Sequence, residues 1–131
     1  MIAKHAELQA TVGAPDAELI ALGDELRKAH PEYLAARTAL NEYDGNPPDD
    51  IEARYYALDW QTCKIAEKIM ATPARTLAGL GVKAVVAIQA ASHYWDAPFQ
   101  DTDWDRKGPR ALIEAVCGLT GVDVAEEAAQ S

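Results

Sequence analysis

The sequence has few cysteines and few aromatic residues, and both shortages constrain its class. Only Cys63 and Cys117 occur among 131 residues, whereas a small secreted domain usually carries several disulfide bridges. Each lies in an apolar pattern of helical spacing, so we interpret both as buried thiols, with a disulfide between them as the alternative. Aromatic residues make up 7% of the chain, and Ala, Leu, Ile and Val dominate the apolar set, which favours helices over β-sheet.

The sequence also lacks long hydrophobic runs and an excess of positive charge. No segment approaches the roughly 20 apolar residues that span a bilayer, and residues 1–18 contain no apolar stretch of signal-peptide length. We therefore expect a cytoplasmic protein without a membrane partner. The 21 acidic and 12 basic residues give a formal net charge of −9, which repels a phosphate backbone, so direct nucleic-acid binding is not expected.

The pattern that the sequence does contain is helical periodicity. Apolar residues recur at steps of three and four from Leu19 to Tyr43 and again from Ile51 to Ile69, which predicts two long helices. The segment between them, YDGNPPDD, is typical of a loop whose last aspartates begin the second helix. Pro31 has no N–H to donate to the carbonyl of Arg27, so we expect a kink or a short break near His30.

A third helix is predicted over residues 77–91, a segment that is apolar almost all round and rich in small residues. Such a helix belongs in the middle of a bundle, where its neighbours approach closely. Either Thr72 or Thr76 can cap its N-terminus. Gly79 and Gly81 each cost about 1 kcal/mol of helix propensity relative to Ala, so we expect close packing at these positions as compensation.

A short fourth helix is predicted to follow Gly108 and Pro109. Its core face consists of apolar residues at helical spacing, namely Leu112, Ile113, Val116 and Leu119. Together these patterns predict an all-α protein, a single-domain bundle of about four helices over residues 16–121. We expect residues 1–15 to form a flexible N-terminal arm and residues 122–131 a flexible acidic tail.

Three segments of the chain carry a resemblance to a bacterial family. DAELIALGDEL, KIMATPARTLAGLGVKA and DTDWDRKGPRALIEAVCGLTGVD resemble parts of small all-helical proteins of alphaproteobacteria, often encoded in phage-like or accessory regions. The resemblance spans about residues 16–123. It implies a bacterial, cytoplasmic setting and a mobile-element origin. Because that family has no assigned activity, the resemblance brings no catalytic residues.

A calcium-binding loop often opens with alternating aspartates, and this chain has such a run at Asp101, Asp103 and Asp105. A loop that starts at Asp101 needs Gly at its sixth position for the turn and Glu at its twelfth as a bidentate ligand. Arg106 and Leu112 occupy those positions, so we expect no metal site and no cofactor. We expect the aspartates instead to precede the fourth helix, where their charge favours its N-terminus, with Trp104 packed inward.

His93 and Asp96 raise the alternative of an acid–base or metal-dependent site. No second histidine lies at ligand spacing, because His5 is in the expected arm and His30 precedes a proline. Neither cysteine has a base at a spacing that indicates nucleophilic catalysis. A phosphate-binding loop is not indicated either, since LAGLGVK lacks the first glycine of that motif and its Ser or Thr. We therefore expect a protein that is not an enzyme.

The segment HYWDAPFQDTDW concentrates aromatic residues among acids. It can bind a partner, or it can fold back and cap the bundle, which we favour because four aromatic side chains in water would form an unusually adhesive surface. The residues that we predict for partner binding combine this segment with acidic loops and first turns. They are Asp49, Asp50, Glu52, Tyr94, Trp95, Asp101, Asp103 and Asp105.

These observations favour a non-catalytic small acidic accessory protein that binds another protein or self-associates as a homo-oligomer. Two alternatives stay open on the sequence alone. One is an enzyme or metal-dependent site around His93, Asp96 and Asp101–Asp105. The other is a phage-related inhibitor whose acidic face mimics the charge of nucleic acid and occupies a basic cleft.

The aspartate run gives a direct test by calcium titration. Because a guanidinium and a leucine stand where the loop needs a glycine and a closing carboxylate, isothermal titration should show no saturable calcium binding below millimolar concentration. A micromolar dissociation constant that is lost in Asp103→Ala would contradict this expectation.

Overall fold

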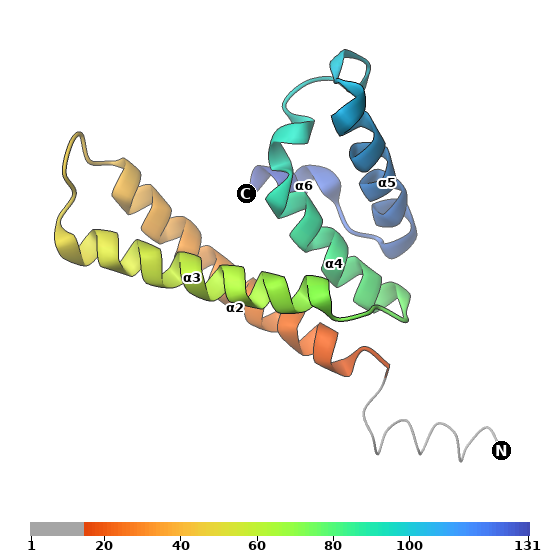
Figure 1. Cartoon of the computed structure of the whole chain (residues 1–131), viewed down its shortest axis with the longest axis horizontal. Coiled ribbons are helices and arrows are strands. Elements are labelled where there is room, and N and C mark those ends of the chain that lie inside the picture. Colours follow the sequence, from red (N-terminus) through yellow and green to blue (C-terminus); the bar gives the residue numbers. More distant parts are fainter. Residues whose placement is uncertain (1–14) are drawn as a thin grey trace. The chain divides into compact units, whose positions relative to one another are not determined.

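The computed structural model describes residues 15–131, and over that range the chain is all-helical, without a strand. The prediction of an all-α fold is confirmed. Its elements are α2 (Ala17–Asn41), α3 (Asp49–Ala71), α4 (Leu77–Ala90), η1 (Ser92–Trp95), η2 (Phe99–Asp101), α5 (Trp104–Thr120) and α6 (Val124–Ala129) (Figure 1). The predicted N-terminal arm falls, except for Pro15, outside the described residues. None of the helices between residues 15 and 131 combines the length and the apolar content needed to span a bilayer.

The chain forms two compact units. One unit comprises residues 21–72 and is called the hairpin unit here. The other consists of Pro73–Ser131 together with the described residues up to Ile20, and is called the C-terminal unit.

In the hairpin unit, α2 and α3 run antiparallel and are joined by the loop over residues 42–48 (Figure 1). The predicted apolar stripes form the contact between them. The buried side chains are Leu22, Leu26, Ala29 and Ala36 from α2, and Leu58, Thr62, Ile65 and Ile69 from α3. The rings of Tyr33 and Tyr55 stack with their centroids 5.8 Å apart, and a hydrogen bond between these side chains, with partial burial, raises the pKa of Tyr55 to about 12.

Pro31 does not split α2, which continues from Ala17 to Asn41. The proline cannot donate to the carbonyl of Arg27, so this carbonyl loses its partner within the helix. Pro31 and Arg27 are both exposed, and water can therefore satisfy the carbonyl. The cost of the proline is thus smaller than it would be on the buried face.

In the C-terminal unit, α4 packs against both α5 and α6. Ala84, Ile88 and Cys117 form the buried centre of the unit. The half-buried apolar side chains around this centre are Trp95, Ile113, Val116, Val122, Val124 and Ala128. The predicted central position of the third helix is therefore correct within this unit. Residues 124–129, which we expected in a flexible tail, form α6, and the Asp123 side chain caps it by accepting a hydrogen bond from the Glu126 N–H at 3.1 Å.

The helix predicted after Gly108 and Pro109 begins earlier, at Trp104. Pro109 deprives the carbonyl of Asp105 of its donor, but both residues are exposed, and the helix continues. The inward face of α5 consists of Arg110, Ile113, Val116, Cys117 and Thr120. Three of our placements are therefore wrong: Leu112 and Leu119, expected in the core, are each 68% exposed, and Trp104, expected to pack inward, is 82% exposed.

The N-terminus of α4 is held by a residue that lies 60 positions earlier in the chain. Asp16 has a positive φ of 67°, a conformation that Asp tolerates better than most residues. Its carboxylate accepts hydrogen bonds from the Arg75 N–H at 2.8 Å and 3.0 Å, the Thr76 N–H at 2.7 Å and the Thr76 hydroxyl at 2.6 Å. The Thr76 hydroxyl oxygen in turn accepts from the Gly79 N–H at 3.0 Å, so of the two predicted caps Thr76 is the one used.

The two glycines of α4 are explained by these close approaches. A Cβ atom at Gly79 would fall on the Asp16 carboxylate, and one at Gly81 would lie 3.4 Å from Thr120 and 3.5 Å from Val122. The predicted close packing at both positions is confirmed. The hydrogen bond from the Thr76 hydroxyl, together with those from the backbone N–H groups, holds the pKa of Asp16 below its ordinary value.

Asp16→Asn tests the contact between Asp16 and the start of α4. Asn has the same shape as Asp and tolerates the same backbone conformation, but it replaces one acceptor oxygen with an NH₂ group that cannot accept from the Arg75 and Thr76 donors. We expect a lower melting temperature than wild type at about pH 7, whereas the exposed control Asp24→Asn stays close to wild type. Folding lowers the pKa of Asp16, so its stabilisation is present above the ordinary carboxyl pKa and is lost as the pH falls through the lowered value. The difference in melting temperature between wild type and Asp16→Asn should therefore become smaller as the pH is lowered towards about 3. A pH-independent difference would contradict the charge-based explanation.

Candidate partner-binding surface

The residues of the predicted alternative site do not form a metal centre. No three His, Cys, Asp or Glu side chains within residues 15–131 are placed to hold a metal ion. His93 is exposed and packs edge-on against Tyr94, with ring centroids 4.7 Å apart, and Asp96 is also exposed. The aspartates lie around the start of α5: Asp101 ends η2, Asp103 is the N-cap residue without a side-chain cap bond, and Asp105 is in the first turn.

The two cysteines are free thiols in different surroundings. Cys117 is buried in the C-terminal unit, as expected, but Cys63 is exposed on α3, so our interpretation of it as buried is wrong. The pKa of each thiol is raised, chiefly by loss of solvation and then by neighbouring carboxylates, Asp59 and Glu67 for Cys63, and Glu114 and Glu127 for Cys117. A raised pKa reduces the thiolate fraction at neutral pH, which disfavours both groups as nucleophiles.

The aromatic segment is fastened to α5 through Arg110, whose side chain is 11% exposed. Its guanidinium donates to the backbone carbonyl oxygens of Tyr94 at 3.0 Å and Ala97 at 2.7 Å, and to Glu114 Oε1 at 3.1 Å. The same Glu114 oxygen accepts from the Trp95 indole N–H at 2.9 Å. These bonds satisfy carbonyls of the loop and hold it against α5, where Tyr94 and Trp95 are half-buried.

The remaining aromatic residues of the segment stay at the surface. Phe99 is 40% exposed and Trp104 is 82% exposed. The Lys107 ammonium lies 5.8 Å from the ring centroid of Phe99 and 5.6 Å from that of Trp104, so it covers part of each ring. The capping interpretation is therefore correct for the first half of the segment and wrong for the second half.

Helix α5 carries a second apolar face opposite the one that packs on α4. At about 100° per residue, the exposed apolar residues of α5 fall within about 120° of arc, centred opposite Ile113. We name them the α5 outer face: Trp104, Gly108, Ala111, Leu112, Ala115, Gly118 and Leu119. Trp104, Leu112 and Leu119 are among the most exposed large apolar side chains of the described chain. Sequence reasoning missed this face, although two sets of apolar residues at helical spacing within residues 104–120 indicate it.

The acidic residues that we predicted for partner binding divide between the two units. Asp101, Asp103 and Asp105 are exposed beside the N-terminal end of the α5 outer face in the C-terminal unit. Asp49, Asp50 and Glu52 are in the first turn of α3 in the hairpin unit, where their charge favours the helix N-terminus. The structure thus brings the first group next to an exposed apolar surface.

The Arg110 network predicts that this side chain stabilises the C-terminal unit. Arg110→Leu keeps the aliphatic packing and removes the donors for two loop carbonyls and Glu114, so we expect a loss of about 1–3 kcal/mol in urea unfolding. The exposed control Arg106→Leu, on the same helix, should change stability by less than about 0.5 kcal/mol. Equal stabilities of the two variants would show that the loop is not held by Arg110.

Comparisons of this chain with models of protein families, with curated proteins and with solved structures find no match.

Proposed function

We propose that this protein is a non-catalytic, small acidic accessory protein that acts by binding another protein through the α5 outer face. The observation that carries the proposal is the exposure of Trp104, Leu112 and Leu119 on a helix whose opposite face already fills the core. Exposed apolar side chains that cluster on one face are characteristic of interaction surfaces. Trp is also among the residues that contribute most binding free energy in interfaces.

The partner that fits this surface is a protein with apolar residues flanked by basic ones. Asp101, Asp103 and Asp105 border the N-terminal end of the outer face, and the whole chain has a formal net charge of −9. This field attracts a basic protein surface and accelerates the encounter. It repels nucleic acid, so the proposed partner is a protein, and the proposed setting is the bacterial cytoplasm that the family resemblance implies.

The test is an affinity purification from a lysate of the source organism with three baits. Wild type and Gln100→Asp, which adds a charge at another exposed position of the same unit, should retain the same basic protein. Leu112→Asp, which places the same charge on the outer face, should lose it, with an affinity reduced by about 2 kcal/mol, or roughly thirtyfold. Circular dichroism should show that both exposed substitutions leave the fold intact.

The purified partner then tests the electrostatic part of the proposal. The association rate should fall as salt rises, because the Debye length is about 8 Å at physiological ionic strength and shortens further above it. Identical proteins retained by all three baits would refute binding at the α5 outer face. An association rate that does not change with salt would remove the role of the acidic residues.

A further inference from the structure

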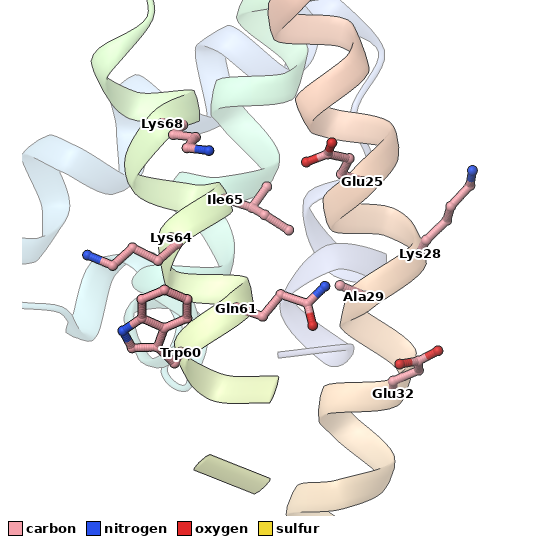
Figure 2. A pocket seen from close by; sticks show the side chains of 9 residues that line it. All are labelled: Glu25, Lys28, Ala29, Glu32, Trp60, Gln61, Lys64, Ile65 and Lys68. Atoms are coloured by element: carbon pink, nitrogen blue, oxygen red, sulfur yellow. The ribbon is translucent and has the colours of Figure 1, made fainter. Parts of the chain in front are cut away.

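A groove runs along one side of the hairpin unit, between α2 and α3, with a volume of about 490 Å³. Figure 2 shows Glu25, Gln61, Ile65 and Lys68 directed into the space between the two helices. Its floor is apolar, because Ala29 and Ile65 are both buried. At one rim Trp60 is 65% exposed, and the Lys64 ammonium lies 5.5 Å from a ring centroid of this tryptophan. An apolar floor with an exposed tryptophan at its rim is suited to a protein surface.

The two rims of the groove carry opposite charge. The α2 rim presents Glu25 and Glu32 with Lys28, which gives a net negative charge. The charged lining residues of the α3 rim are Lys64 and Lys68, and Lys64 is also paired with Glu67 of the same helix at 3.4 Å. Because α2 and α3 are antiparallel, Glu25 lies at the level of Lys68 along the hairpin, and Glu32 lies near the level of Trp60 (Figure 2). The groove therefore presents acid along one edge and base along the other.

We propose that a second copy of this chain occupies the groove, so that two hairpins form a four-helix bundle. A two-fold interface uses the same patch on both copies, and this patch must be complementary to itself. If the two-fold axis lies parallel to the helices, α2 of each copy covers α3 of the other, and each acidic rim meets a basic rim. If the axis lies across the helices in the plane of the interface, α2 meets α2 and α3 meets α3, and like charges face one another.

The charge pattern thus selects the first arrangement. It places Glu25 of each copy over Lys68 of the other, with Glu32 close to the Lys64 turn, while the apolar floors face one another at the centre and the Trp60 rings lie along the α3 rims (Figure 2). A hairpin of two helices has only one helix–helix contact, and pairing two such hairpins is the arrangement of many four-helix bundles. This inference concerns a different surface from the α5 outer face and does not depend on the proposed function.

Charge exchange tests the arrangement with the full-length chain. In Glu25→Lys/Glu32→Lys both rims are basic, and in Lys64→Glu/Lys68→Glu both are acidic; all four positions are exposed, so the fold should be kept. Sedimentation equilibrium should show a dimer for wild type and, for each variant alone, a dissociation constant raised about tenfold or more. An equimolar mixture of the two variants should form a dimer again, because opposite charges then meet at both contacts.

The two exposed tryptophans provide matched variants for the apolar contact. Trp60→Ala should weaken the dimer by about tenfold or more, whereas Trp104→Ala should leave the dimer unchanged and weaken binding of the heterologous partner. Trp60→Ala therefore tests the dimer, and Trp104→Ala tests binding of the heterologous partner. Because the two variants are measured in separate assays, the dimer and the proposed function can each be refuted without the other.

A mixed disulfide distinguishes the two symmetry axes. In a Cys63→Ser background, Glu25→Cys and Lys68→Cys proteins should form a cross-linked dimer when they are mixed under oxidising conditions. Each protein oxidised alone should form little cross-linked dimer.

The inference is overturned if wild type remains a monomer at millimolar concentration, if the dimer persists in both charge variants, or if mixing the two charge variants does not restore the dimer. A dimer without the mixed disulfide would overturn the proposed axis.

Discussion

The carboxylate of Asp16 connects two segments that are 60 residues apart in the chain, and the C-terminal unit depends on this contact at the start of α4. The first N–H groups of a helix have no partner within it, and α4 has no acidic residue in its first turn to offset its positive end. Asp16 and Thr76 together supply the acceptors. The need for this contact explains the left-handed backbone of Asp16 and the absence of a side chain at Gly79.

Both units are small, and this limits how much of each helix they can bury. The α4 helix packs against both α5 and α6. Only one face of α5 is packed against the rest of its unit, and a second apolar face of this helix stays exposed. In the hairpin unit, α2 and α3 bury the stripe between them and leave the Trp60 side of the groove open. The α5 outer face is of the kind expected where a helix is more apolar than its own unit requires, whereas the groove of the hairpin unit is bordered mainly by charged side chains.

Several features followed from local sequence alone. The apolar stripes of α2 and α3, which contain Leu26 and Ile65, are buried as their helical spacing predicted. Of the two threonines that the sequence offered as caps for α4, Thr76 is the one used. We expected a kink or a short break near Pro31, and the break did not occur: α2 continues through the proline, whose unpartnered carbonyl belongs to the exposed residue Arg27. The exposure of Asp101, Asp103 and Asp105 was also expected from the sequence, since charges on loops and first turns tend to stay in water.

The sequence by itself determined that the chain is helical, where its long helices lie and that its surface is acidic, because propensity, spacing and charge are local properties. Only the tertiary structure decided which of two apolar faces of α5 is buried. Leu112 and Ile113 are neighbours with equal hydrophobic character, and contact with α4 selects Ile113 and leaves Leu112 in water. The Asp16 contact is equally a tertiary feature, since no local pattern relates a carboxylate to a helix whose N-cap residue lies 60 positions later.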